Sequence, residues 1–201
     1  MNTRLITRAA MAGTAVVVAA AAAGATGTGG RTPASAASQH QVVTMSGYEL
    51  DTRLSAMTKY TGNAEVVVAD VTAVEPARWN TPSGTAPDAP DPLSFIFTPV
   101  RVSVVDVLRG DGALAGQELT VRRFEGTVGG VTFQQEHGPV AALHDGQRVV
   151  LFLQPEQPLD DGRSDRIPNA AYVLQADGSL LSPEGDASET LAQLKALLGV
   201  A

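Results

Sequence analysis

Four runs of residues that are rich in β-branched side chains constrain the fold of this chain more than any other feature. Three of them, AEVVVADVTAV (64–74), SFIFTPVRVSVVDVL (94–108) and ELTVRRF (118–124), alternate apolar with polar residues over much of their length, which is typical of strands with one buried face. The fourth, RVVLFL (148–153), is apolar without a break after its arginine, which predicts a central strand. The chain is therefore expected to fold mainly as β-sheet.

Details of these runs predict how the sheet bends and turns. The alternation in the second run doubles at Val104 and Val105, which indicates a β-bulge. Proline has no N–H for the ladder, so Pro99 in the same run is expected at an edge or a break. Further along the chain, Asp177-Gly178 separates two short strand-like segments and predicts a type I′ hairpin.

A short helix is predicted at each end of the folded domain. Ser46 and Glu49 have the spacing of a capping box, and so do Asp186 and Glu189. Apolar residues at helical intervals follow each pair: Leu50, Leu54 and Met57 after the first, and Leu191, Leu194, Leu197 and Leu198 after the second.

Five to seven strands, glycine-rich corners and a helix at each end favour a small OB-like barrel, closed or partly open. A β-sandwich is the alternative architecture. The sequence contains no internal repeat that would favour a solenoid or a propeller.

Residues 1–36 have the organisation of a secretory signal peptide. Arg4 and Arg8 give a positively charged beginning, a run of small apolar residues follows, and Ala34-Ser35-Ala36 matches the small-x-small pattern of a cleavage site. We expect cleavage before Ala37. The alternative is an uncleaved membrane anchor, but the apolar run is rich in alanine and glycine and shorter than the ~20 strongly apolar residues of a spanning helix.

Cleavage leaves a disordered lead-in over residues 37–45 and a single domain over residues 46–201. We expect this mature protein to be secreted, with no membrane attachment. It carries 11 basic against 21 acidic side chains, a net charge of −10, which argues against nucleic acids and anionic membranes as partners. The chain has no cysteine, so no disulfide assists its packing. Abundant alanine and only two lysines suggest a GC-rich coding sequence and hence a bacterial source.

The segments AEVVVADVTAV, TPVRVSVVDVLRG, GQELTVRRFEGTVGG and HDGQRVVLFL, which together cover residues 63–154, resemble a pattern in exported bacterial proteins of unknown role. The pattern is similar to the OB-like barrel of netrin-like domains and of the tissue inhibitors of metalloproteinases. That resemblance implies a fold rather than an activity. Ala69 stands where such proteins often have a glycine. The inhibitors chelate zinc through an amino-terminal cysteine, and this chain has none, so their mechanism does not carry over.

The sequence offers no recognisable catalytic residues. It has no cysteine, no G-x-S-x-G motif and only three histidines, His40, His137 and His144, so nucleophilic catalysis has few bases to use. Metal binding is the stronger chemical alternative, because Glu136-His137 and His144-Asp145 supply two imidazoles with a carboxylate, which suits Zn²⁺. The competing interpretation places His137 in a solvated loop and His144 at the start of a turn.

Two further motifs each have a chemical and a structural interpretation. The segment Asp160-Asp161-Gly-Arg-Ser-Asp165, with Glu156 nearby, concentrates oxygen ligands of the kind that Ca²⁺ prefers. It lacks the D-x-D-x-D-G order, so a solvated loop with local ion pairs is the competing interpretation. Arg109-Gly110-Asp111 spells the tripeptide that integrins recognise, but its position between strands favours a turn.

The proline-rich loop over residues 78–93 is the main candidate for binding. Trp79 and Asn80 stand at its beginning, and a rigid aromatic ring supplies a large contact area at little entropic cost. The alternative is that Trp79 covers the open end of the barrel. A second polar loop runs from residue 155 to residue 168.

These features support three functional hypotheses. The first is a secreted, non-enzymatic β-barrel module that binds an extracellular protein or a cell-wall polymer through the 78–93 loop. The second is a metal-binding protein or metal-dependent hydrolase that uses His137 and His144. The third is a secreted peptidase inhibitor, which rests on the resemblance. The first needs no cofactor, and the sequence does not specify an oligomeric state.

Overall fold

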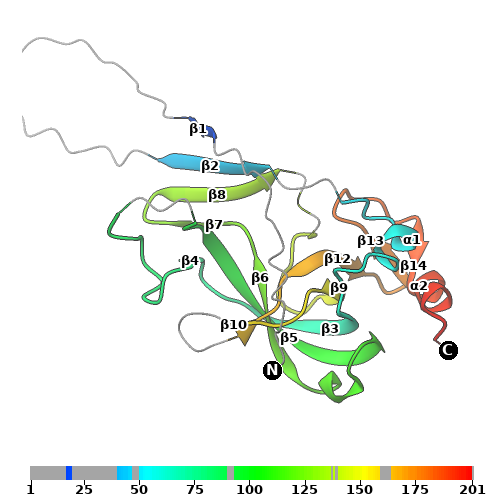
Figure 1. The fold of residues 1–201 in the computed structure, drawn as a ribbon. Helices are drawn as coiled ribbons and strands as arrows, with labels where there is room; N and C mark the ends of the chain where they lie inside the picture. The colour runs from blue at the N-terminus through cyan, green and yellow to red at the C-terminus, as the bar shows by residue number, and fades with distance from the viewer. Residues whose placement is uncertain are drawn as a thin grey trace, which may run out of the picture.

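The computed structural model describes residues 17–19, 40–46, 50–89, 93–136, 138, 140–158 and 164–200. They form a mainly β domain with one short helix near its start and another at its C-terminal end (Figure 1). This arrangement confirms the predicted fold class. None of the described helices is both long and apolar enough to cross a membrane.

The four β-branched runs form the centre of the main sheet. They become β3 (Glu65–Val74), β5 (Ile96–Arg109), β6 (Glu118–Arg123) and β9 (Arg148–Leu153), and β12 (Pro168–Leu174) lies beside β9. The strand order is β12-β9-β3-β5-β6, with every neighbouring pair antiparallel. β9 lies at the centre, as its unbroken apolar run predicts, and it is buried from Val149 to Leu153.

Shorter elements complete the main body. β13 (Ser179–Leu181) and β14 (Glu189–Thr190) extend the sheet beyond β12, and β4 (Arg78–Trp79) pairs with the start of β5. A two-stranded ribbon of β10 (Gln157–Pro158) and β11 (Ser164–Asp165) precedes β12, and the 3₁₀ turn η1 (Gly112–Leu114) follows β5.

The main sheet curls until β6 meets the residues that precede β12. The Arg122 N–H donates to the Arg166 carbonyl at 2.9 Å, and the Arg166 N–H donates to the Thr120 carbonyl at 2.9 Å. A closed barrel would need a full strand pairing here, but in the part of the chain that the structure describes β6 and the residues before β12 are joined only by a single bridge at Arg166. Within the described residues the sheet remains a partly open structure and not a closed barrel.

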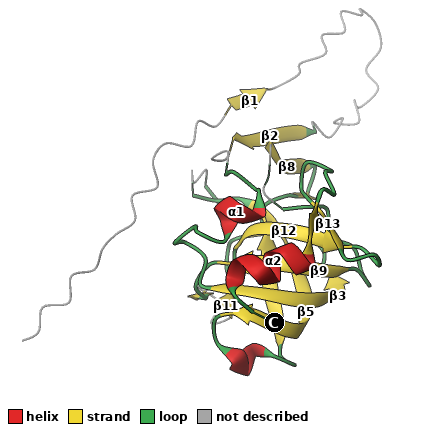
Figure 2. Ribbon diagram, turned by 90° about the vertical axis from the view of Figure 1, so that its right-hand side faces the viewer, coloured by secondary structure: helices red, strands yellow, loops and turns green. Residues whose placement is uncertain are grey.

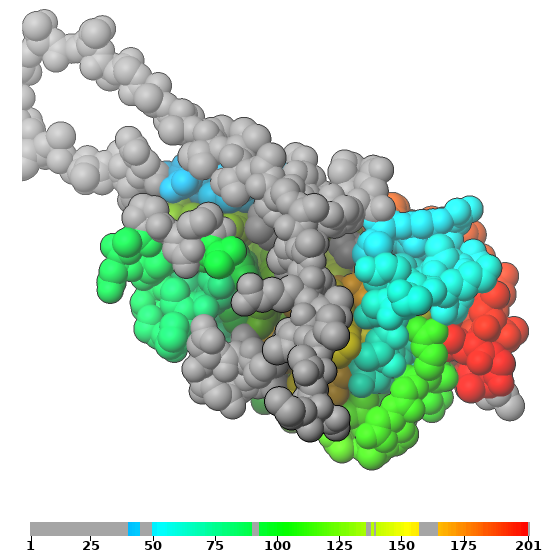
Figure 3. All heavy atoms as spheres, in the orientation of Figure 1, coloured from blue at the N-terminus to red at the C-terminus, as the bar shows by residue number. Residues whose placement is uncertain are grey.

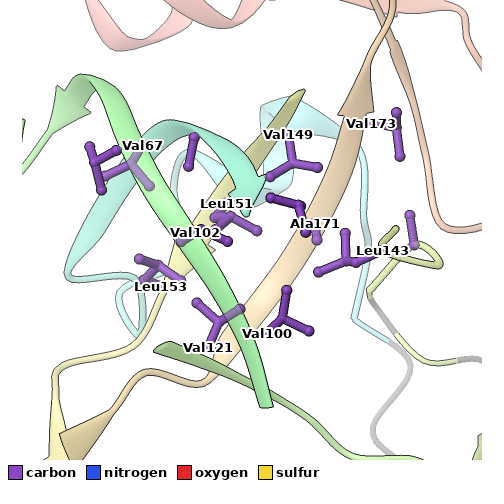
Figure 4. Packing of buried hydrophobic residues seen from close by; sticks show 14 residues of the cluster. Val67, Val100, Val102, Val121, Leu143, Val149, Leu151, Leu153, Ala171 and Val173 are labelled. Carbon is purple, nitrogen blue, oxygen red and sulfur yellow. The ribbon is translucent and has the colours of Figure 1, made fainter. Parts of the chain in front are cut away.

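Valine, leucine and alanine side chains fill the inside of the curled sheet. Figure 4 shows side chains of β3, β5, β9 and β12 pointing toward one another, with Val67, Val102, Leu151 and Ala171 among them. These four residues are fully buried. Because no disulfide assists this core, burial of apolar surface is the main term that stabilises the fold.

Two irregularities of β5 agree with the sequence. Val68 pairs with Asp106 and Ala69 pairs with Val104, so Val105 has no partner on β3 and forms the predicted bulge. Pro99 lies one residue beyond the last β3–β5 pair, which joins Val74 to Val100. Pro99, which has no N–H to donate, therefore lies at the end of the β3–β5 ladder, as predicted.

Both α-helices cover the other face of the main sheet (Figure 2). α1 (Leu54–Met57) and α2 (Leu191–Leu198) bury Leu54, Met57 and Leu194 against a second apolar cluster. The aromatic members of this cluster, Phe152 and Tyr172, meet edge to face with their ring centroids 5.8 Å apart.

The predicted helix starts were wrong in register, and the reason is a long-range contact. Of the first predicted pair, Ser46 lies in a strand (Gln41–Ser46) and Glu49 lies outside the described residues. α1 begins at Leu54, whose N–H donates to both oxygens of the Glu189 carboxylate at 3.0 Å. Glu189 is thus unavailable to cap its own helix. The capping box of α2 is formed by Thr190 and Gln193 instead.

The Asp177-Gly178 turn is real, but its type differs from the prediction. Gly178 donates its N–H to the Gln175 carbonyl at 3.0 Å, so Ala176 and Asp177 occupy the centre of the turn. Gly178 follows them with a φ of 85°. A three-residue connection of this kind places glycine at the left-handed position after the turn, in contrast to the two-residue type I′ loop.

A second sheet lies beside the main body. It contains β2 (Gln41–Ser46), β7 (Gly126–Val128) and β8 (Val131–Glu136), in the order β2-β8-β7, and β1 (Val17–Ala19) pairs with the free side of β2. β2 corrects the predicted disordered lead-in of 37–45 over residues 41–45, whereas residues 37–39 lie outside the described residues. Val43 is buried with Ile96 and Phe133, so packing orders a segment that is too short for its pattern to predict a strand.

The buried hydroxyl of Tyr172 makes the free energy of unfolding depend on pH in the alkaline range. Its hydroxyl donates to the Thr52 carbonyl, and burial, together with the negative charges of Glu189, Glu184 and Asp51, raises its pKa well above the ordinary value of 10.0. In the unfolded chain this tyrosine ionises near pH 10. We therefore expect the free energy of unfolding to fall above that pH, by at most about 1.4 kcal/mol per pH unit from this group. Denaturant titrations between pH 8 and pH 11 should show a steeper decline for the wild type than for Tyr172→Phe. Parallel declines would contradict the assignment.

Candidate functional site

The 78–93 loop leaves the main body beside the second sheet, at the opposite end of the molecule from α1 and α2 (Figure 1). Its first residues form β4, where Arg78 pairs with Phe97 and Trp79 pairs with Ile96. In the space-filling view the loop protrudes as a separate lobe (Figure 3). The description covers this loop except for residues 90–92.

Asn80 fastens the two ends of the loop together. Its Nδ2 donates to the Leu93 carbonyl at 2.9 Å, and its Oδ1 accepts the Phe95 N–H at 2.8 Å. Its own N–H donates to the Phe95 carbonyl at 3.0 Å. Asn80, predicted as a binding residue, therefore has a bracing role in which both ends of its amide are used within the chain.

Trp79 lies against the apolar cluster beneath the second sheet. Its ring meets the Phe133 ring edge to face, with centroids 5.5 Å apart and an interplanar angle of 78°. The side chain is partly buried with Ile96 and Val43. Trp79 therefore packs within this cluster, and only part of its ring faces solvent.

The hydroxyl groups of the loop shape its tip. The Thr81 hydroxyl donates to the Thr85 carbonyl at 2.7 Å, and the hydroxyls of Ser83 and Thr85 are 2.7 Å apart. Gly84 adopts a φ of 71°, donates its N–H to the Thr81 carbonyl at 2.9 Å and accepts the Trp79 N–H at 3.0 Å. These contacts are local, so the tip is a folded turn rather than an extended strand.

The side chains that the loop presents to solvent differ from those that the sequence indicated. Leu93 has 77% of its surface exposed, the highest fraction among the large apolar residues that the structure describes. Pro82, Ser83, Thr85 and Asp88 are also exposed. The loop thus combines a braced base with an exposed apolar residue at one end. Periodicity gave no signal for Leu93, because a single leucine between two loop segments has no pattern around it.

The structure describes only part of the proposed zinc site. The side chain of Glu136 and the whole of His137 lie outside the described residues. His144 is exposed, and its N–H donates to the Gln147 Oε1 at 2.7 Å. The Asp145 Oδ1 accepts the Val74 N–H at 2.7 Å, so this carboxylate helps to fix a turn. Among the described residues no group of three potential ligands is positioned to hold a metal ion.

The structure also describes only part of the acidic segment that suggested a calcium site. Asp160 and Asp161 lie outside the described residues. Asp165 is described and buried, and it pairs with an arginine: its Oδ2 accepts from the Arg122 Nε at 2.9 Å and its Oδ1 from the Arg122 Nη2 at 2.7 Å. This oxygen pair is therefore already used by a guanidinium.

The Arg122–Asp165 pair is the largest feature that sequence analysis missed. The Arg122 guanidinium lies 5.1 Å from the centroid of the Phe97 ring and 5.7 Å from that of Phe95. Beside it, Arg166 pairs with Glu65, and both of these side chains are nearly buried. These contacts fasten the described part of the 155–168 loop to β6 and to the start of β3, so this part has a structural role.

The Arg109-Gly110-Asp111 tripeptide forms a turn, as expected. The Arg109 Nη1 donates to the Thr58 carbonyl at 2.7 Å, and the Asp111 Oδ1 accepts the Ala113 N–H at 2.9 Å. Gly110 has a φ of 112° and lies against Glu65. Arg109 therefore joins the end of β5 to the residue after α1, and Gly110 and Asp111 form the connection to η1.

One shallow depression lies on the surface of α2, lined by Glu189, Gln193, Ala196 and Leu197. Its carboxylate belongs to Glu189, which already accepts the Leu54 N–H. The 78–93 loop, with its braced base and its exposed leucine, thus remains the best candidate for a functional site. No protein-family model matches the chain, and no curated protein matches it.

Proposed function

We propose that the chain is exported, that its leader is removed, and that the mature domain is a non-enzymatic module that binds an extracellular protein or a cell-wall polymer. Its contact surface is the 78–93 loop. The observation that carries this proposal is that Asn80 braces the base of the loop while Leu93 stays 77% exposed.

The bracing favours binding for an entropic reason. Association orders the flexible side chains and loops at an interface, and each ordered group costs free energy that a pre-formed loop has already lost on folding. The Asn80 amide braces the base of this loop, and the Thr81, Ser83 and Thr85 hydroxyls shape its tip. An exposed leucine beside such a loop supplies apolar surface, which contributes about 25 cal/mol for each Å² buried on binding.

The charge of the mature domain narrows the class of partner. With a net charge of −10, the domain is repelled by polyanions and attracted by basic surfaces, whereas uncharged surfaces do not repel it. An apolar anchor together with hydroxyl groups suits a protein surface or a neutral glycan. The proposed partner is therefore an extracellular protein or a wall polymer with little negative charge.

We expect Leu93→Asp to weaken binding by about tenfold or more, as removal of a central apolar contact typically does. The probes are purified wall sacculi, scored by co-sedimentation, and concentrated culture supernatant of the producing organism, scored by cross-linking. Asn80→Ala should weaken binding as well, because it frees the loop without changing an exposed contact. Val105→Asp is the matched control, since Val105 is 46% exposed near the other end of β5.

The result that overturns the proposal is equal binding, or equal absence of binding, by wild type, Leu93→Asp and Val105→Asp with both probes. Export is tested separately by mass spectrometry of the secreted chain. An amino terminus at Ala37 is expected, and secretion of a chain that retains residues 1–36 would contradict leader removal.

A further inference from the structure

The outer edge of β2 becomes available when the leader is removed. On one side β2 pairs with β8 in parallel over its whole length, from Gln41 with Val131 to Ser46 with Glu136. On its other side β2 pairs with β1, which lies within the leader (Figure 1). The inference therefore rests on the leader removal proposed above. Without residues 17–19, β2 ends the second sheet.

This edge lacks the features that natural proteins use to protect an edge strand. Such strands carry charged residues, prolines or bulges, which discourage pairing with another chain. The sequence of β2, QVVTMS, has no charge and no proline, and its register with β8 contains no bulge. An uncharged strand of six residues that is rich in valine is suited to accept another strand.

The backbone of β2 presents three hydrogen-bonding residues to this edge, Val42, Thr44 and Ser46. Gln41 donates its N–H to the Gly130 carbonyl, on the β8 side, at 2.9 Å. Because successive residues of a strand direct their N–H and C=O groups to opposite sides, Val42 and Thr44 direct theirs away from β8. In an antiparallel partner strand these two residues would form the closely hydrogen-bonded pairs, with Val43 between them.

The leader shows which register the edge accepts. Its Val17 pairs with Thr44, Val18 with Val43 and Ala19 with Val42, antiparallel to β2. β2 has nearly the same sequence, with Val42 and Val43 followed by Thr44 where the leader has alanine. A second β2 strand can therefore replace β1 in the same register. Val43 then faces Val43 of the second copy, and Val42 faces its Thr44.

This register is symmetric, which distinguishes a second copy of the chain from other occupants. A two-fold axis through the Val43 pair makes both contacts between Val42 and Thr44 equivalent, and such isologous pairing uses the β2 edges of both copies, so no free β2 edge is left. From these observations we infer that the mature protein forms a homodimer through antiparallel pairing of β2 with β2 of a second copy. The two second sheets join into one continuous sheet.

Side-chain positions allow a test that leaves the fold intact. Val43 is buried, whereas Val42 and Thr44 lie on the opposite face of β2, where Gln134 donates to the Thr44 hydroxyl at 3.1 Å. In the proposed dimer, substitutions at positions 42 and 44 face each other across the axis. Like charges placed directly opposite on paired strands repel, and opposite charges attract.

The experiment compares the secreted, processed wild type with two double variants by sedimentation velocity over concentrations from about 1 to about 300 µM, the range in which a small strand-edge interface is expected to associate. The wild type should dimerise. V42K/T44K should weaken the dimer by about tenfold or more, because two like-charge pairs form. V42K/T44E is the matched control at the same positions, and it should restore dimerisation because each lysine then faces a glutamate.

Three results would overturn the inference. If the wild type is monomeric over the whole concentration range, β2 does not pair with a second copy, and an extended segment of another protein becomes the candidate partner for this edge. A dimer that both double variants leave unchanged would place the interface elsewhere. Retention of the leader in the secreted chain, read by mass spectrometry, would mean that the edge is never released. Circular dichroism of the two variants should match that of the wild type, so that loss of the dimer reports pairing and not unfolding.

Discussion

Replacement of Asp165 by alanine is expected to lower the free energy of unfolding by about 3–5 kcal/mol, the usual cost of leaving one partner of a buried ion pair uncompensated. The Asp165 side chain is 1% exposed and that of Arg122 is 10% exposed. The variant would leave the Arg122 guanidinium beside the Phe95 and Phe97 rings with no carboxylate to pair with it. Urea denaturation of wild type and variant measures the loss directly.

Two comparisons separate the ion pair from other effects at this site. Arg122→Met combined with Asp165→Leu removes both charges, and it should recover most of the lost stability, because apolar residues of similar volume often replace a buried pair without cost. Asp70→Ala breaks the exposed Arg148–Asp70 pair, which has similar geometry. Its loss should be a small fraction of the Asp165 effect, because solvent screens an exposed pair. Equal losses for Asp70→Ala and Asp165→Ala would refute the argument from burial.

The strands that could be predicted are those in which local pattern and tertiary packing agree. RVVLFL is apolar on both faces, and β9 is covered on both faces by the two main apolar clusters. The doubled valines at Val104 and Val105 indicate a bulge because the period of two fails there, and the β3–β5 register shifts at the same place. In these cases the residues nearby in sequence contain the whole cause.

Features that depend on distant residues could not be predicted. Glu189 has the sequence context of a helix cap, yet it accepts the Leu54 N–H, 135 residues away. Asp165 belongs to an acidic loop by composition, yet it pairs with Arg122, 43 residues away. Local sequence periodicity does not indicate such contacts, because they form only when the tertiary fold brings distant segments together.

The candidate site also combines features that could be predicted with features that could not. The exposed, proline-rich character of the 78–93 loop could be predicted from its composition, and its tip is exposed in the structure. The roles of Trp79 and Asn80 could not be predicted, because they depend on contacts with Phe133 and with the carbonyl of Leu93. The position of Leu93 relative to the loop base likewise follows from the Asn80 contacts, which fix where the loop ends.

Gly126→Ala is expected to destabilise the protein by about 2–5 kcal/mol, the sum of backbone strain and overpacking. Gly126 has a φ of 147°, which L-residues rarely adopt, and a Cβ at this position would lie 2.4 Å from the Ala77 Cβ. Gly126 is the first residue of β7, and around it the second sheet meets Ala77 and the β5 residues Ile96 and Thr98 of the main body. The added methyl group should therefore push the second sheet away from the main body, and with it the contact between Trp79 and Phe133.

Because Trp79 is the single tryptophan of the chain, its fluorescence reports this displacement, and a red shift in Gly126→Ala at low denaturant is the expected signature. Gly129→Ala is the matched control: Gly129 has a φ of 60° and no atom within 4 Å of the added Cβ, so only the backbone cost of about 1 kcal/mol should remain.

In Ala77→Gly combined with Gly126→Ala the nearest clashing atom is gone, so the two substitutions should couple favourably by about 1 kcal/mol or more in a double-mutant cycle. Additive losses and an unshifted spectrum would show that Gly126 serves its backbone angle alone and does not set the distance between the two sheets.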